Sequence, residues 1–269
     1  MFSQIEKHLE DNSLENLFGG EQSFELKIKA GHIRAMTDIA MKIAEEIVEN
    51  IDKKLLYVCC MHHDDGRALQ FKLLGSFNDR EVSHNALGVD MLDRYIMAHN
   101  VVMTREIQIL RNCIYYHGRL HLMGASLEYD FDEEMMKYVQ IVSDADDIEN
   151  GCIGAVGYLA HEVETDAKGY QRDYPQFERI IKPELFEFYK NGQWFNKIEY
   201  CKSYAEYILF AATLAMKSIK KYGDIAKFAM RNPCYGYDSA VDGYIDLFHR
   251  YFSAEDANLA SQILLDVFK

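Results

Sequence analysis

The sequence contains little proline or glycine and no long hydrophobic run. Its 269 residues include only 3 Pro and 16 Gly, so long helices meet few interior breakers. The longest uncharged apolar run, residues 207–216, is about half of what a bilayer-spanning helix needs. The first ten residues mix Glu, Lys and Gln and lack the apolar segment of a signal peptide. These absences argue against a membrane association and predict a soluble, cytoplasmic protein.

Positive charge is also scarce. Lys and Arg number 29 against 43 Asp and Glu, which gives a formal net charge of −14. A chain of this charge repels nucleic-acid phosphates, so general nucleic-acid binding is not expected. The six cysteines form no CxxC pair, and two of them are adjacent within an apolar run. This usage predicts buried, reduced thiols rather than disulfides.

Apolar residues recur at spacings of three and four along much of the chain, which is the period of a helix with one buried face. Such stripes begin near Ala30, after Ser83 and after Thr104, and the stripe that carries Met135 ends near Asn150. Ser and Thr at those starts are favourable N-caps. Alternation with a period of two is nowhere sustained, so the sequence predicts an all-α fold.

Three segments can be distinguished. Residues 1–25 are mixed and polar, residues 26–150 form the predicted helical core, and residues 151–269 continue helical without a recognisable motif. We expect the last segment to be a C-terminal extension packed on the core, with its clearest helices at 203–222 and 253–268. Its many Met and aromatic side chains indicate core packing, or the surface of a homodimer, rather than a cofactor site.

Four histidines occupy positions where their helices should contact other helices. His32, His63, His84 and His117 each lie beside or at the end of an apolar stripe, on four separate predicted helices. A single imidazole in such a place is usually a hydrogen-bonded core residue. Several imidazoles with nearby acids point instead to a metal, because one ion can satisfy many buried polar groups together. The interior of a helical bundle is a common place for such a site.

The acidic residues divide by helical phase. Asp64 directly follows His63, and Asp146 extends an apolar stripe by one further turn. Asp144 and Asp147 instead follow mostly polar positions and should face solvent. Phase therefore selects Asp146 as the inward carboxylate of this acidic stretch.

This order of histidines and acids resembles the HD-domain superfamily of metal-dependent phosphohydrolases. The segment MHHDDGR resembles the family's LHDIGK, DADDIEN resembles ADxLxN, SHNALGVDML is similar to HxxxGxxxL, and CIYYHG resembles the next histidine helix. The resemblance covers about residues 26–150 and implies an HD-domain-like helical bundle. It also implies a binuclear metal site in which Asp64 bridges two ions, with the remaining ligands being His32, His63, His84, His117 and Asp146.

Some assignments remain open on the sequence. His62 has the spacing to replace His63 as a ligand. Arg67, which stands where the family has Lys, could bind a substrate phosphate or form a structural ion pair. Asp65 could orient an imidazole or lie in a solvated turn, and His121 could face the pocket or an exposed loop. The Gly-Tyr-Pro segment of members that cleave cyclic dinucleotides does not occur, which argues against that substrate.

The resemblance implies a hydrolase. We expect one or two divalent ions, namely Fe, Mn, Zn, Ni or Mg, because imidazoles and carboxylates together suit such metals. Such ions activate water and clamp a phosphoryl group, so we expect hydrolysis of a phosphate ester or anhydride in a nucleotide or other small phosphorylated metabolite, with Asp64 and Arg67 as catalytic residues. Two alternatives are an HD-fold diiron oxygenase resembling myo-inositol oxygenase and a non-catalytic HD-like signalling module.

Overall fold

The structure is a computed structural model, and the elements described below belong to two compact units. It describes Lys7 and residues 24–46, 50–75, 79, 81–118, 132–157, 159, 181, 183–191, 203–233 and 236–269. The units comprise residues 1–146 and residues 147–269. No strand occurs within the described ranges, which confirms the all-α prediction. No helix in those ranges combines the length and apolar character that a bilayer crossing requires.

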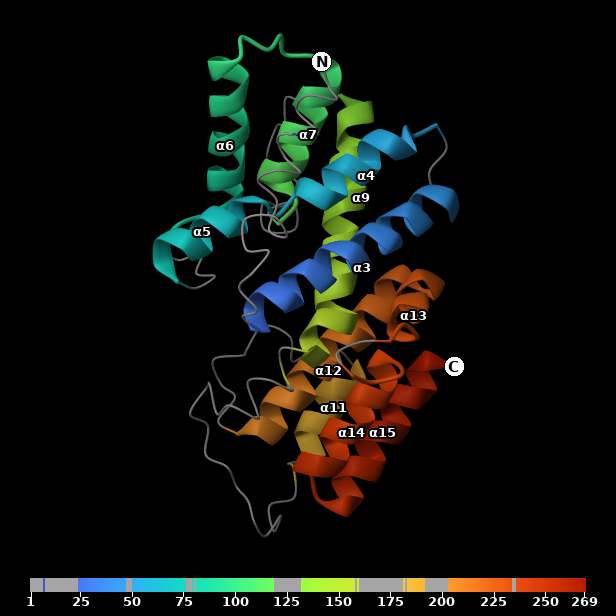
Figure 1. The fold of residues 1–269 in the computed structure, drawn as a ribbon. Helices are drawn as coiled ribbons and strands as arrows, with labels where there is room; N and C mark the ends of the chain where they lie inside the picture. The colour runs from blue at the N-terminus through green and yellow to red at the C-terminus, as the bar shows by residue number, and fades with distance from the viewer. Residues whose placement is uncertain are drawn as a thin grey trace. The chain divides into compact units, whose positions relative to one another are not determined.

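The N-terminal unit is a bundle of helices that pack in adjacent pairs (Figure 1). Helix α3 contacts α4, α4 contacts α7, and α6 lies against both α5 and α7. Their apolar stripes form the interior, as the sequence periodicity predicts. The helices are α3 (Phe24–Glu46), α4 (Lys53–His62), α5 (Gly66–Leu74), α6 (His84–Ala98), α7 (Arg105–Tyr116) and α9 (Glu133–Glu149).

Side-chain caps fix where two of these helices begin. Asp52 Oδ1 accepts hydrogen bonds from the backbone N–H groups of Lys54 and Leu55, which starts α4. Ser83 caps α6 by accepting a hydrogen bond from Ala86 N, as predicted. Thr104 precedes α7 at the predicted place, but its hydroxyl makes no cap hydrogen bond.

Helix α5, which the sequence periodicity did not reveal, begins in direct contact with α6. A Cβ atom on Gly66 would lie 1.9 Å from the carbonyl oxygen of His84 and 2.6 Å from the nitrogen of Gly88. A Cβ on Gly88 would in turn lie 2.8 Å from a methyl carbon of Ile114. No side chain fits at this crossing. The two glycines therefore allow the turn after α4 to approach the first residue of α6.

Helix α9 passes from one unit into the other, and the division lies between Asp146 and Asp147. The α-helix ends at Glu149, as the predicted stop near Asn150 requires, but the prediction missed that the chain stays helical beyond it. The chain continues as a π-helical segment, η2 (Asn150–Gly154), and residues 155–157 are again α-helical. A Cβ on Gly154 would lie only 2.9 Å from a carboxylate oxygen of buried Glu149, so this wider turn accommodates an acidic side chain.

The C-terminal unit is built around α12 (Tyr204–Tyr222), which contacts η2, α11, α13, α14 and α15. Its interior is aromatic, and Tyr189, Tyr204, Tyr244 and Phe248 are fully buried. The predicted helices at 203–222 and 253–268 are present within one residue at each end. The packing of this segment on the core stays a prediction. The elements are η2, α11 (Pro183–Asn191), α12 (Tyr204–Tyr222), α13 (Asp224–Met230), α14 (Ala240–Tyr251) and α15 (Ala254–Phe268).

Candidate metal centre

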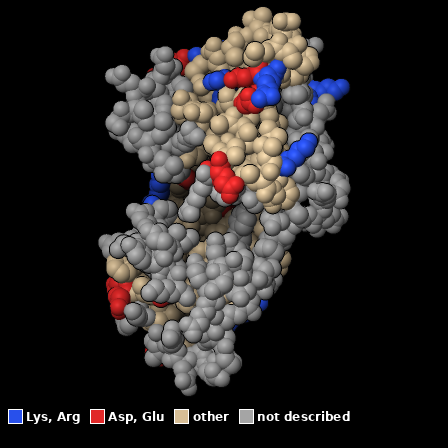
Figure 2. All heavy atoms as spheres, turned by 90° about the vertical axis from the view of Figure 1, so that its left-hand side faces the viewer, with Lys and Arg blue, Asp and Glu red and all other residues tan. Residues whose placement is uncertain are grey.

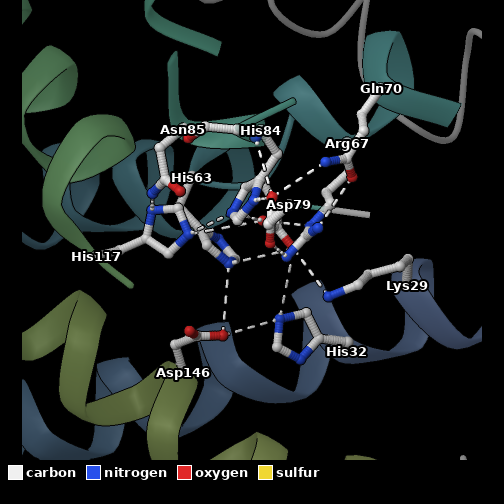
Figure 3. Close-up of polar contacts among 12 residues, drawn as sticks. Lys29, His32, His63, Arg67, Gln70, Asp79, His84, Asn85, His117 and Asp146 are labelled. Carbon is white, nitrogen blue, oxygen red and sulfur yellow. Dashed lines mark hydrogen bonds and ion pairs between the residues drawn. The ribbon is translucent and has the colours of Figure 1, made fainter. Parts of the chain in front are cut away.

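The six predicted ligands converge in the N-terminal unit: five of them are labelled together in Figure 3, and the Asp64 carboxylate lies within 3.9 Å of the four imidazoles. They come from α3, from the turn after α4, from the first residue of α6, from the end of α7 and from α9. The four imidazoles and the Asp64 side chain are buried. The structure thus brings together residues that lie far apart in the sequence, while their role as ligands stays a prediction. They are His32, His63, Asp64, His84, His117 and Asp146.

Asp64 lies at the centre of this cluster, and its two carboxylate oxygens face different imidazoles. Oδ1 is 3.1 Å from His84 Nε2 and 3.6 Å from His117 Nε2. Oδ2 is 3.9 Å from the Nε2 atoms of both His32 and His63. One carboxylate therefore separates two pairs of imidazoles, each of which faces one of its oxygens.

Asp146 completes the group around His32 and His63. Its Oδ1 lies 3.1 Å from His32 Nε2 and 3.8 Å from His63 Nε2. Burial favours the protonated acid, but the neighbouring imidazoles outweigh it and hold the pKa of Asp146 well below its usual range. Asp146 therefore faces the histidines, which is the direction that helical phase predicts for it.

Backbone carbonyls fix the orientation of two imidazoles. His63 Nδ1 lies 2.7 Å from the carbonyl oxygen of Cys60, and His117 Nδ1 lies 3.0 Å from that of Ile114. A ring nitrogen that bonds to a carbonyl carries the proton, so the opposite nitrogen presents a lone pair. In both residues this opposite atom is Nε2, the atom that faces Asp64. This tautomer is the one in which histidine binds a metal.

His84 is oriented by a side chain that the sequence analysis missed. Its Nδ1 lies 2.6 Å from Asp79 Oδ1, which leaves Nε2 directed at Asp64. Burial opposes a charged imidazole, but the two carboxylates outweigh it and raise the pKa of His84. Asp79 precedes α6 in a segment without helical periodicity, so no pattern singled it out. Its position five residues before a predicted ligand was the only available signal.

These side chains fit a divalent metal. Two sets of donor atoms lie within 4.8 Å of one another, namely His32, His63 and Asp146, and His63, Asp64 and His117. The buried Nε2 of His63 makes no hydrogen bond with the described residues. Burial lowers the pKa of His63 to about 3, so the ring stays neutral and able to donate its lone pair. Neutral imidazoles with ionised carboxylates suit first-row divalent ions.

A buried lysine also contacts the cluster, and the sequence analysis missed it. Lys29 Nζ lies 3.1 Å from Asp64 Oδ2, and only 7% of the residue is exposed. Burial favours the neutral form of Asp64, yet the charges of Lys29 and His84 hold its pKa well below the usual range. Lysine on a helix is normally solvated, so its charge gave no signal. Its position three residues before His32, on the same helix face, could have indicated it.

The structure shows the contacts of His62, Asp65 and Arg67, for which the sequence left alternatives open. His62 Nδ1 lies 2.8 Å from Asp65 Oδ2, so His62 binds Asp65 while His63 faces the cluster. Asp65 is therefore a buried acid that orients an imidazole, although not that of a predicted ligand. Arg67 forms ion pairs, with Nη2 2.9 Å from Asp79 Oδ2 and Nε 3.6 Å from Asp64 Oδ1. His121 lies outside the described residues.

Comparison with known proteins gives one match. Residues 30–151 match the family model of the HD domain. This span contains all six predicted ligands and ends within η2. No curated protein and no solved structure matches the chain.

Proposed function

Residues 30–151 are an HD domain, and on this premise we propose that the protein is a metal-dependent phosphohydrolase. It would cleave a phosphate ester or anhydride in a small phosphorylated metabolite, with a nucleotide as the favoured class. One observation carries the proposal. Asp64 presents one oxygen to His84 and His117 and the other to His32 and His63, which is the arrangement of a carboxylate shared between two metal positions.

The chain offers a ligand set for each position. Divalent ions bound here supply Lewis-acid polarisation of a phosphoryl oxygen and lower the pKa of water. Two bound ions would share Asp64. The first position would be held by His32, His63 and Asp146, and the second by His84 and His117.

Lys29 adds a protein cation to this buried region. Its ammonium group, 3.1 Å from Asp64 Oδ2, is fixed on α3 beside the carboxylate and is shielded from bulk water. A positioned cation in such surroundings stabilises negative charge more strongly than it would in water. We therefore assign Lys29 to the stabilisation of the charge that develops on a phosphoryl group.

Arg67 lies at the edge of the same cluster. Its guanidinium bonds to Gln70 Oε1 at 2.9 Å and to Asp79 Oδ2 at 2.9 Å. The planar fork of arginine matches a phosphate as well as a carboxylate. A bound substrate phosphate would therefore compete with Asp79 for Arg67, and Arg67 would contribute to substrate binding rather than to metal binding.

The charge of the protein supports a small substrate. On the face that Figure 2 shows, Lys and Arg side chains of the described residues are scattered beside acidic ones and form no continuous basic surface. The whole chain carries a formal net charge of −14. A polyanion would be repelled by such a protein, whereas a single phosphate group needs only the local positive charge of the site.

The test is an anaerobic assay of metal-loaded protein in ¹⁸O-labelled water. Nucleotides, dinucleoside polyphosphates and simple phosphomonoesters serve as substrates, and Arg67→Gln and His63→Ala serve as matched variants. We expect one labelled oxygen in the product phosphate, a raised KM with unchanged metal content for Arg67→Gln, and loss of turnover for His63→Ala. Turnover that requires dioxygen and yields a non-phosphate product would replace this proposal with a diiron oxygenase. Bound metal without any turnover would favour a signalling module.

A further inference from the structure

Three of the imidazoles around the Asp64 carboxylate, those of His63, His84 and His117, are not all oriented by the same kind of group. His63 and His117 bond through Nδ1 to backbone carbonyl oxygens of their own helical turns. His84 is the first residue of α6 and has no preceding helical turn to supply such a carbonyl. Its Nδ1 instead lies 2.6 Å from Asp79 Oδ1. The tautomer of His84 therefore depends on a side chain.

Asp79 is itself held in place by several donors. Its Oδ1 also accepts hydrogen bonds from the backbone N–H of His84 at 3.1 Å and from Gln70 Nε2 at 3.0 Å. Its Oδ2 lies 2.9 Å from Arg67 Nη2. Gln70 is fully buried, and its amide also donates to the carbonyl of Val82. This network fixes the carboxylate against α5 and α6, although 45% of the Asp79 side chain is exposed.

We propose that Asp79 is a positioning residue that fixes the tautomer and direction of His84, and that it thereby determines the affinity of the metal position formed by His84, His117 and Asp64. The inference rests on the metal centre of the proposed function. A carboxylate that accepts the second ring N–H of a ligating histidine orients the ring and raises its basicity. Removing such a partner typically costs about 10- to 100-fold in metal affinity.

A purely structural role would make a different prediction. Asp79 accepts the N–H of the first residue of α6, so its loss could act only by weakening the helix start. Asp52 provides a matched control, because it caps α4 through two backbone N–H groups and has no hydrogen bond to an imidazole within the described part of the chain. Asp52→Ala removes a cap, whereas Asp79→Ala removes a cap and the partner of His84.

The experiment measures ion binding to the full chain by equilibrium dialysis against Zn²⁺ or Mn²⁺, with elemental analysis of the protein. Wild type should bind two ions. Asp79→Ala should retain the first and bind the second about 10- to 100-fold more weakly, and Asp52→Ala should match wild type. Asp79→Asn keeps an oxygen acceptor but loses the charge, so its loss of affinity should be smaller. In the Zn²⁺-loaded protein, ¹⁵N spectra of the histidines should show the His84 proton on Nδ1, hydrogen-bonded to Asp79, in wild type, and should lose this hydrogen-bonded Nδ1 signal in Asp79→Ala.

Each outcome bears on one claim. Unchanged affinity for the second ion in Asp79→Ala, or an equal loss in Asp52→Ala, overturns the inference while leaving the proposed function standing. If Asp79→Ala fails to fold, Asp79→Asn decides, and wild-type binding in that variant overturns the inference. A wild type that binds two ions but hydrolyses no phosphate refutes the proposed function without touching Asp79. A wild type that binds no second ion overturns the inference about Asp79, whereas hydrolysis of phosphate in the ¹⁸O assay would still support the proposed function.

Discussion

The two units of this chain differ in what they bury. Among the described residues of the C-terminal unit, the buried acidic side chains are Glu149 and Asp256, and the largest fully buried groups are aromatic rings. The N-terminal unit instead buries a whole set of basic, acidic and imidazole groups, which are Lys29, His32, His62, His63, Asp64, Asp65, His84 and His117. Burying such groups costs free energy, so a core optimised for stability alone would not collect them.

The buried polar groups of the two units also have different hydrogen-bond partners. In the C-terminal unit the polar atoms of buried rings bond to backbone carbonyls, as Tyr189 does with Ala260. In the N-terminal unit the polar groups bond mainly to one another around Asp64. Perturbed ionisation in such a cluster is typical of a functional site. Variants in the two units should therefore affect different measurements.

The largest effect should come from His63. Because only this member of the adjacent pair faces Asp64 and Asp146, His63→Ala should lose most of the bound metal. His62→Ala is the matched variant, and it should keep the metal because His62 bonds to Asp65. Elemental analysis of both proteins, purified without chelator, tests this. Equal metal content in the two variants would contradict the ligand assignment.

The close contact between α5 and α6 predicts the next largest effect. Gly66→Ala places a Cβ 1.9 Å from a backbone oxygen, and relief of this overlap should cost about 3 kcal/mol or more. A Cβ on Gly31 of α3 meets no atom within 4 Å, so Gly31→Ala should be neutral or stabilising by about 0.5–1 kcal/mol. Urea unfolding measures both, and similar midpoints would refute the packing explanation.

Asp146 and Asp144 provide a test within one helix. Asp146→Asn weakens the contacts with His32 and His63, so metal content and turnover should both fall. Asp144→Asn should change them much less. The measurement is metal stoichiometry together with turnover for each variant. A larger effect at Asp144 would mean that the helical phase is misplaced by two residues.

Acid should destabilise the metal-free protein. The pKa of His63 is lowered to about 3, whereas the unfolded chain protonates near its ordinary value of about 6.5. Between these values the unfolded state binds the extra proton, so stability falls as the pH falls, by up to about 1.4 kcal/mol per pH unit. His84 has a raised pKa and acts in the opposite sense above pH 6.5. Melting curves recorded in chelator from pH 7 to 4 measure how steeply stability depends on pH. His63→Gln should make this dependence shallower.

The smallest effect is expected in the C-terminal unit. The Tyr244 hydroxyl lies 3.3 Å from the carbonyl oxygen of Gly151 and 3.2 Å from that of Ala211. Tyr244→Phe should cost about 1 kcal/mol of stability and leave metal content unchanged. Loss of metal in this variant would contradict the expectation that only the N-terminal unit affects metal binding.

Helical periodicity predicted from the sequence the inward direction of part of the candidate site. His32 and Asp146 lie on apolar stripes, so their inward direction could be read from spacing alone. The same method failed for Lys29, because a charged side chain is expected to be exposed to solvent. Its burial depends on an ion pair with Asp64, which lies on a turn far away in the sequence. It also failed for Asp79, because the direction of a side chain outside a helix cannot be inferred from helical periodicity. Lys29 and Asp79 are both held in place by contacts with other segments of the chain.

The fold was predicted with similar limits. The helical class followed from the absence of sustained alternation, and this was confirmed. Helix α5 is short and follows a two-aspartate turn, so its pattern was too brief to detect. The π-helical turn after Glu149 was missed because Asn-Gly suggested a stop, whereas burial of the preceding carboxylate against Gly154 lets the helix continue.

The acceptors behind the imidazoles have an evolutionary consequence. The carbonyls that orient His63 and His117 belong to the main chain, so they persist whichever amino acids stand at positions 60 and 114. The acceptor behind His84 is encoded by a single codon, that of Asp79. The orientations of His63 and His117 are thus insensitive to which side chains stand at positions 60 and 114, whereas the orientation of His84 can be changed by one point mutation at Asp79.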